Sequence, residues 1–299
     1  MKVRAQIRLL PDRRRLHLHD GPIDLVIQAF GEPQAVAAAY QTASSRFVNV
    51  LDELCCELAF LRLRCSSDSP WPRGKVARRM FAATLPYAAK YFITPMAAVA
   101  GAVAEEILET MVAHAELSRA YVNNGGDIAL HLDRGEQFVV GMVERPDRPS
   151  LFGTTTLRWD QPARGIATSG WRGRSFSLGI ADAVTVLAER AAAADAAATI
   201  IGNAVDLPRS PKIVRAPARH LAPDSDLGDR LVTQAVAELN PVEIDHALSA
   251  GCQTAELLLR MGLICSAALH LQGETRVVGN SGKLNRRITP TRERALAHA

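Results

Sequence analysis

Three short segments in the middle of the sequence combine residue types that could act together on an anionic ligand. The first reads NNGGD at residues 123–127, between two runs with strand character. Asn and Gly tolerate positive φ, so this segment is typical of a hairpin turn. The same turn would let backbone N–H groups converge on an anion beside the carboxylate of Asp127. The residues alone leave both interpretations open.

The second segment places hydroxyl and guanidinium groups close together. Residues 165–170 read GIATSG and are followed by WRGRSFS, which contains Arg172 and Arg174. Guanidinium groups donate forked hydrogen bonds to phosphate oxygens, so the segment could form a phosphate or oxyanion clasp. Ser, Thr and Gly are equally typical of an ordinary loop. No Gly-Lys-Ser/Thr follows, so the segment is not a Walker-type phosphate loop.

The third segment contains Asp195 and Thr199, four residues apart in an alanine-rich run. On a helix these positions lie on one face, so a carboxylate and a hydroxyl would point the same way. Such oxygen pairs suit Mg²⁺, which completes its shell with water and substrate phosphates. Alternatively, Asp195 caps or solvates the helix and Thr199 bonds to the carbonyl one turn earlier.

The hydrophobic periodicity around these segments predicts a protein of mixed secondary structure. Helical spacing dominates before residue 119, and short strands follow it. Apolar positions at helical spacing predict a helix over residues 33–64, and Thr94-Pro95 predicts the start of another. We expect Cys55 and Cys56 to be small core residues, and Glu105 and Glu109 to form a solvated face. The other expected elements are helices at 74–89, 191–203, 228–239 and 242–261, strands at 3–10, 15–19, 25–30, 119–122, 128–132, 137–143, 154–159, 181–188 and 264–271, and an exposed excursion at 207–226.

Composition favours an ordinary globular protein and limits its partners. The formal net charge is +4, but residues 1–20 and 274–299 each carry +4, so the body between them is mildly acidic. That distribution argues against nucleic-acid binding. Five cysteines without a CxxC spacing fit a reducing compartment, and no secretory signal or apolar run of membrane-spanning length is visible. We therefore expect a cytoplasmic protein that binds no membrane; its oligomeric state stays open.

The order NNGGDI, GIATSG, ADAAAT resembles the ApbE-like flavin-transferase superfamily. The phrases ITPMAAVAGAVAEE, GIATSGWRGRSFSLG and ADAVTVLA look still closer to a cytoplasmic, poorly characterised branch of it. The resemblance covers residues 1–272 and implies one ApbE-like α+β domain with a mainly antiparallel sheet. Residues 273–299 would form a basic, mobile tail.

The resemblance also implies a ligand and site residues. Members of the superfamily bind FAD and Mg²⁺, and the best-known activity transfers FMN from FAD to a protein threonine. Carried over by motif, a flavin (FAD or FMN) or another small phosphorylated ligand would contact Asn124, Gly125, Gly126, Asp127, Thr168, Ser169, Gly170, Arg172 and Arg174. Mg²⁺ would be held by the Ala167 carbonyl, Asp195 and Thr199. Asp127 and Asp182 are the candidates for proton transfer.

One departure separates the chain from the transferases. They carry His-Ile-x-Asp-Pro-x-Thr-Gly after the Ala-Thr-Ser-Gly segment, whereas this sequence reads SFSLGIADAV, without His or Pro. An alternative function is sulfide incorporation during homocysteine formation, with which some members of the closer branch are associated. Another is a non-catalytic flavin-binding accessory protein.

Overall fold

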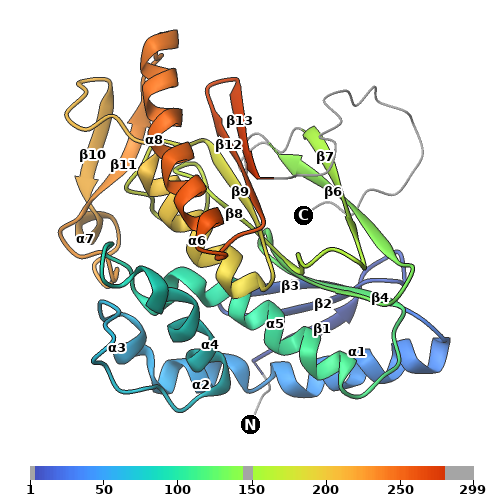
Figure 1. Cartoon of the computed structure of the whole chain (residues 1–299). Coiled ribbons are helices and arrows are strands. Elements are labelled where there is room, and N and C mark those ends of the chain that lie inside the picture. Colours follow the sequence, from blue (N-terminus) through green and yellow to red (C-terminus); the bar gives the residue numbers. More distant parts are fainter. Residues whose placement is uncertain (1–3, 144–150, 280–299) are drawn as a thin grey trace.

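A nine-stranded antiparallel sheet forms the centre of the computed structural model, which describes residues 4–143 and 151–279 (Figure 1). Its strand order is β1-β2-β3-β4-β5-β8-β9-β12-β13. In that order the strands are β1 Gln6–Leu9, β2 Leu16–Asp20, β3 Ile23–Phe30, β4 Arg119–Asn124, β5 Asp127–Leu132, β8 Gly165–Ser169, β9 Ala183–Ala188, β12 Ser266–Leu271 and β13 Glu274–Gly279. The expected α+β class with a mainly antiparallel sheet is confirmed.

Helices cover one face of this sheet and a hairpin packs on part of the other. In β5, Ile128, Leu130 and Leu132 point into a small core under the hairpin of β6 (Gln137–Val143) and β7 (Leu151–Arg158), while Ala129 points into the large helical core. This alternation follows from the period of two along a strand. The helices are α1 Pro33–Phe47, α2 Val50–Cys56, α3 Leu58–Leu61, α4 Lys75–Thr84, α5 Val99–Val112, α6 Ala191–Ala204, α7 Ala218–Leu221 and α8 Pro241–Arg260, with 3₁₀ turns η1 Leu85–Tyr87 and η2 Pro95–Ala98.

The expected helix over residues 33–64 is three helices. The chain turns at Asn49 and again at Glu57, the residues that precede α2 and α3. Cys55 and Cys56 are exposed, so the expectation that they are core residues is wrong. Helical spacing identified the apolar face correctly, but it cannot show where a long amphipathic run bends around its neighbours.

The region after α6 also differs from expectation. Residues 228–239, expected to be helical, contain strand β11 (Leu231–Val236), which pairs with β10 (Ile213–Pro217) inside the expected excursion. A run as short as LVTQAV fits the 3.6-residue period of a helix and the two-residue period of a strand equally well, and its pairing with β10 makes it a strand. The sheet also continues past residue 272, because β13 pairs with β12 through six residue pairs. The remainder of the expected basic tail, 280–299, lies outside the described residues.

Glu105 is buried, as is its neighbour Glu106, so the expectation of a solvated face on α5 is wrong for this part of the helix. Glu106 binds Arg46 and Glu105 binds Arg190, while Arg79 bonds to both carboxylates. Buried carboxylates require such partners, and these cations come from α1, α4 and the start of α6, all distant in sequence. Within the part of the chain that the structure describes, no helix is both long and apolar enough to cross a membrane.

Candidate functional site

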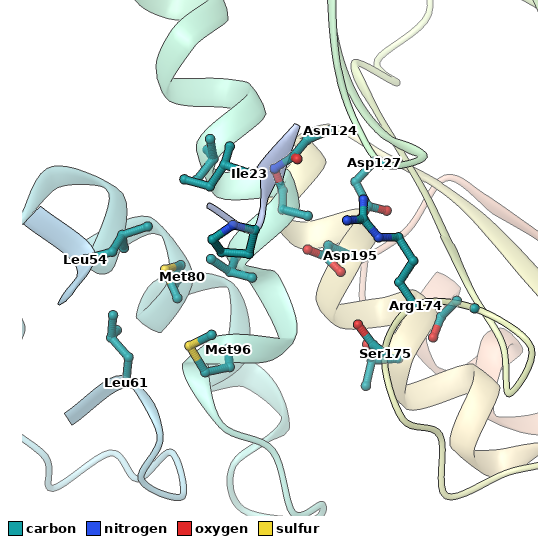
Figure 2. A pocket seen from close by; sticks show the side chains of 18 of the residues that line it. Ile23, Leu54, Leu61, Met80, Met96, Asn124, Asp127, Arg174, Ser175 and Asp195 are labelled. Atoms are coloured by element: carbon teal, nitrogen blue, oxygen red, sulfur yellow. The ribbon is translucent and has the colours of Figure 1, made fainter. Parts of the chain in front are cut away.

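The three segments converge on one cavity of about 770 Å³, although they come from different parts of the fold (Figure 2). The hairpin turn between β4 and β5, the end of β8 with the loop after it, and helix α6 form its polar side. The predicted residues that line it are Asn124, Gly125, Asp127, Thr168, Ser169, Gly170, Arg174, Asp195 and Thr199.

The NNGGD segment is both a hairpin turn and a wall of the cavity. Asn124 pairs with Asp127 across the turn, and the two glycines between them have φ of +66° and +109°. Positive φ at both central residues is the signature of the tight hairpin turn, which explains the glycines. The Asn123 side chain accepts a 2.8 Å hydrogen bond from the Gly126 N–H, so that N–H is directed into the turn itself.

Arg174 lies against this turn from the opposite segment. A Cβ added to Gly125 would lie 3.3 Å from its Nη1 atom. The Arg174 side chain is exposed and forms no ion pair or hydrogen bond with any described residue. Its guanidinium is therefore available for an anionic ligand in the cavity.

Asp127 and Asp195 form the most distinctive electrostatic feature of the site. Both are partly buried on the polar side, and neither forms an ion pair within residues 4–143 and 151–279. Burial raises the pKa of Asp127 well above its ordinary value, and the neighbouring Asp195 carboxylate raises it further. Burial raises the pKa of Asp195 to about 7, against the lowering effect of hydrogen bonds from the N–H groups of Gly101 and Ala100. Two such carboxylates without a partner cation are unfavourable unless they share a proton or bind a positive ion.

Thr199 lies one turn after Asp195 on α6 and also faces the cavity. Its hydroxyl makes no hydrogen bond within the described chain, so the alternative of a bond to the preceding turn is not observed. Asp195 does not cap its own helix either. Its Oδ2 accepts a 3.0 Å hydrogen bond from Gly101 N–H in the first turn of the neighbouring helix α5.

Four of the predicted site residues do not reach the cavity. Asp182, a candidate for proton transfer, accepts hydrogen bonds at both oxygens, from Trp171 and Arg172 at Oδ1 and from the Gln272 N–H at Oδ2. It therefore fixes the loop before Arg174 to the end of β12, and Arg172 belongs to that anchor. Gly126 is held in the turn described above. Ala167, whose carbonyl was the predicted metal ligand, is buried in β8 opposite Val186 and is not among the residues that line the cavity.

Sequence reasoning missed the opposite side of the cavity, which is apolar. Its signal was present in the leucines at positions 51, 54, 58 and 61, whose spacing predicted a buried helix face. These side chains border the cavity instead of only filling the core. The apolar side consists of Pro22, Ile23, Leu51, Leu54, Leu58, Leu61, Met80, Met96, Val99 and Val103, with Cys55 and Arg62 as its polar members.

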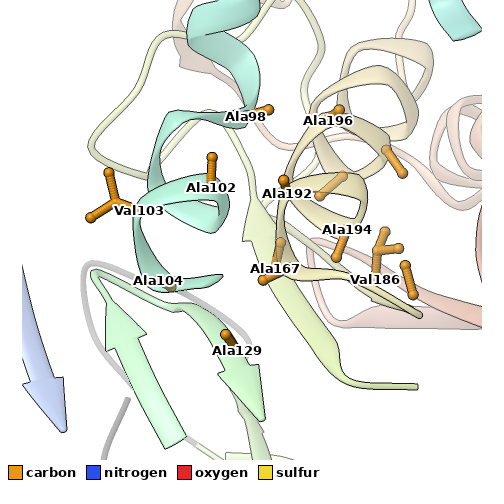
Figure 3. Packing of buried hydrophobic residues seen from close by; sticks show 14 of the residues in the cluster. Ala98, Ala102, Val103, Ala104, Ala129, Ala167, Val186, Ala192, Ala194 and Ala196 are labelled. Carbon is orange, nitrogen blue, oxygen red and sulfur yellow. The ribbon is translucent and has the colours of Figure 1, made fainter. Parts of the chain in front are cut away.

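Reciprocal contacts between α5 and α6 hold Asp195 in place. Glu105 of α5 accepts a 2.8 Å hydrogen bond from the N–H of Ala192 in the first turn of α6, while Asp195 of α6 accepts from the start of α5. Small residues allow the close approach (Figure 3). A Cβ on Gly101 would lie only 2.3 Å from the Ala191 carbonyl oxygen, so this position requires glycine.

The fold and the cavity define an α+β protein with a polar, carboxylate-bearing pocket. The sequence matches the family described as AbpE bacteria over residues 7–277. The chain therefore belongs to that family and is a member of the ApbE-like superfamily.

Curated relatives match a little less than half of the chain. A UPF0280 protein of Methanopyrus kandleri is 42% identical over 129 residues, which are 43% of this chain and 48% of the relative. A UPF0280 protein of Methanocella arvoryzae is 38% identical over 150 residues, 47% of this chain and 53% of the relative. The chain thus spans about half the length of the curated relatives it matches.

Among solved structures, a mutant of the flavin transferase ApbE from Vibrio cholerae aligns with 90% of this chain and 98% of its own. Its sequence identity is 12% and the TM-score is 0.39. That likeness is too distant to bear on the chemistry of this cavity.

Proposed function

We propose that the cavity binds the phosphate portion of a small ligand together with Mg²⁺. The observation that carries the proposal is the pair of partly buried carboxylates, Asp127 and Asp195, which form no ion pair with any described residue and whose pKa values are raised by burial. A divalent cation would neutralise both. Arg174 on the same side would contact the phosphate oxygens that complete the charge balance.

The donor atoms fit Mg²⁺ and do not fit a softer metal. No group of three or more His, Cys, Asp or Glu that could hold a metal occurs in the described ranges. The protein offers carboxylate oxygens and the Thr199 hydroxyl, which are hard ligands, and leaves several positions to water and ligand phosphate. When bound, Mg²⁺ would neutralise phosphate charge on the ligand.

Flavin nucleotides are the first phosphorylated ligands to test, because the chain belongs to the ApbE-like superfamily. The polar side would bind the flavin phosphates and Mg²⁺ in either of two kinds of protein. One is an FMN transferase-like enzyme, and the other is a flavin-binding protein without transfer activity. In the absence of Mg²⁺, Asp127 would hold a proton that an exposed carboxyl has already lost, because burial and the Asp195 carboxylate raise its pKa, and it would release that proton when Mg²⁺ binds. Incubation with FAD, Mg²⁺ and a threonine-containing acceptor separates the two, since only the enzyme would attach FMN covalently.

Substitution of the two α6 side chains tests the metal site. Asp195→Asn keeps the size of the side chain and removes its charge, so Mg²⁺-dependent pyrophosphate binding should weaken about tenfold or more, which corresponds to about 1.4 kcal/mol. Thr199→Val removes the second oxygen at nearly constant shape and should have a smaller effect in the same direction. Isothermal titration with and without Mg²⁺ measures both.

Asp133→Asn is the matched control, because Asp133 is exposed and lies outside the cavity. It removes the same charge and should leave binding unchanged. If Asp195 served only to cap α5, Asn would replace it almost as well. Unchanged affinity in Asp195→Asn would therefore contradict the metal site.

A further inference from the structure

The two sides of the cavity differ sharply in chemistry. Figure 2 places Asp127, Asp195, Arg174 and Ser175 on one side and apolar side chains, among them Met96, on the other. A ligand whose phosphate lies against the polar side must therefore direct the rest of its structure toward the apolar side. The composition of that side decides which kind of structure it can accept.

The apolar side has little capacity to hydrogen-bond a ligand. Ten of its twelve residues are aliphatic or Met or Pro, and no aromatic ring lines the cavity anywhere in the described chain. Of the two polar members, Arg62 is paired with Asp224 at 2.8 Å. The other, Cys55, carries only a weakly hydrogen-bonding thiol.

This wall does not match a ring system edged with hydrogen-bonding groups. Such groups would lose their water without gaining partners, which is unfavourable for binding. Nor is there an aromatic side chain on which a planar ring could stack. Flexible aliphatic and thioether side chains instead adapt to a hydrocarbon chain, and each buried methylene strengthens binding roughly fourfold.

The wall is also open enough to receive such a chain. Leu51, Leu58, Met96 and Val99 are partly exposed where they border the cavity, whereas Leu61 and Met80 are fully buried behind them. The total volume of about 770 Å³ is in the range of small-molecule sites. A phosphate with a hydrocarbon chain would therefore contact both sides at once.

We propose that the ligand of this cavity is a phosphate or diphosphate ester of a hydrocarbon chain, with the chain against the apolar side. This inference rests on the proposed function for the phosphate end and adds the identity of the other end. Farnesyl diphosphate is a suitable probe, since it joins a diphosphate to a branched hydrocarbon chain. Inorganic pyrophosphate, FAD and farnesol are the comparison ligands.

Isothermal titration of the full chain in the presence of Mg²⁺ tests the proposal. Farnesyl diphosphate should bind at least about tenfold more tightly than pyrophosphate and more tightly than FAD. Met96→Gln keeps the side-chain length but adds an amide to the apolar side, so it should remove most of the gain over pyrophosphate. The matched control is Met261→Gln at the exposed end of α8, which lies outside the cavity and should leave the gain intact. A thermal melt of each variant verifies that it is folded.

The outcomes separate this inference from the proposed function. If pyrophosphate binds but farnesyl diphosphate binds no better, or if FAD binds more tightly than farnesyl diphosphate, the hydrocarbon-chain ligand is overturned and the phosphate site stands. An equal loss in Met96→Gln and Met261→Gln also overturns it. If pyrophosphate and farnesyl diphosphate both fail to bind with Mg²⁺, the phosphate site and the inference built on it are overturned together. If farnesol binds as tightly as farnesyl diphosphate, the proposal that the ligand is a phosphate ester is overturned, because the phosphate would then contribute nothing to binding.

Discussion

Asp127 and Asp195 lie on the polar side of the cavity, where burial raises the pKa of both carboxyls. Each accepts a backbone hydrogen bond, from Thr168 N–H and Gly101 N–H respectively, which favours the charged form. Burial outweighs these bonds, because each carboxylate receives too few donors to replace its lost water. Without a cation, the pair therefore retains protons at pH values where an exposed carboxyl has lost them.

This pair predicts a pH-dependent stability of the metal-free protein. Between about pH 4, near the pKa of Asp in the unfolded chain, and about pH 7, the folded state binds more protons than the unfolded state, so stability falls as the pH rises. We expect this contribution to amount to about 1–2 kcal/mol after allowance for partial exposure. Mg²⁺ should therefore raise the Tm more at about pH 8 than at about pH 5.

Thermal unfolding at the two pH values, with and without Mg²⁺, measures this effect. Other carboxylates in the protein also titrate, so the informative quantity is the difference between the wild type and Asp195→Asn. That variant should lose the Mg²⁺ response and the part of the pH dependence that comes from Asp195 and its charge, while the part due to burial of Asp127 remains. An equal Mg²⁺-induced rise in Tm at both pH values would contradict the assignment.

Helices α5 and α6 are the elements that make the site possible. Asp195 of α6 accepts a hydrogen bond from the Gly101 N–H at the start of α5, and Glu105 of α5 accepts one from the Ala192 N–H at the start of α6. Glu105 also binds Arg190 at 2.8 Å and Arg79 at 3.1 Å, so one buried carboxylate ties α4, α5 and the start of α6 together. The orientation of Asp195 toward the cavity depends on this arrangement.

We predict that Glu105→Gln destabilises the protein by about 1–3 kcal/mol, because an uncharged amide would replace the buried carboxylate that bonds to Arg79, Arg190 and the Ala192 N–H. Glu109→Gln is the matched control on the same helix. The Glu109 side chain is 48% exposed and binds the same two arginines, so water can replace it and the loss should be below about 1 kcal/mol. Urea denaturation of both variants gives the two values, and equal losses would show that burial of Glu105 does not matter.

The whole molecule is organised by one long sheet whose edges are β1 and β13. β1 is exposed along its length, whereas β13 covers β12 and contributes Val278 to the core. The cavity is lined on one side by Pro22, Ile23 and residues of the helical region 51–103, and on the other by the β4–β5 turn, the end of β8 with the loop after it, and α6. Its two sides thus come from different halves of the chain.

Two truncations distinguish the final strand from the residues after it. A chain ending at Gly273 loses β13 and leaves one edge of β12 unpaired, although the other edge still pairs with β9, so its Tm should fall by several degrees. A chain ending at Gly279 keeps β13, and we expect its Tm to stay nearly unchanged, since residues 280–299 are basic and carry little apolar surface. Differential scanning calorimetry compares the two. A large decrease in the longer chain would mean that residues 280–299 stabilise the body.

Local chemistry in the sequence determined several features correctly. The glycines of NNGGD specified a tight turn because only they adopt its positive φ values without strain. The spacing of Asp195 and Thr199 placed both side chains on one helix face, and the alternating runs of residues 119–132 became β4 and β5. Each of these depends on interactions within a few residues, which the sequence displays directly.

Only the tertiary structure decided features that depend on distant partners. Asp127 and Asp182 have the same chemistry, yet Asp182 meets Arg172 and the Gln272 N–H while Asp127 meets a cavity and another carboxylate. Glu105 is a buried carboxylate whose partners, Arg79, Arg190 and the Ala192 N–H, all come from other elements. The free energy of burying a charge is set by whatever packs around it, and the chain brings those groups together from positions that no local pattern relates.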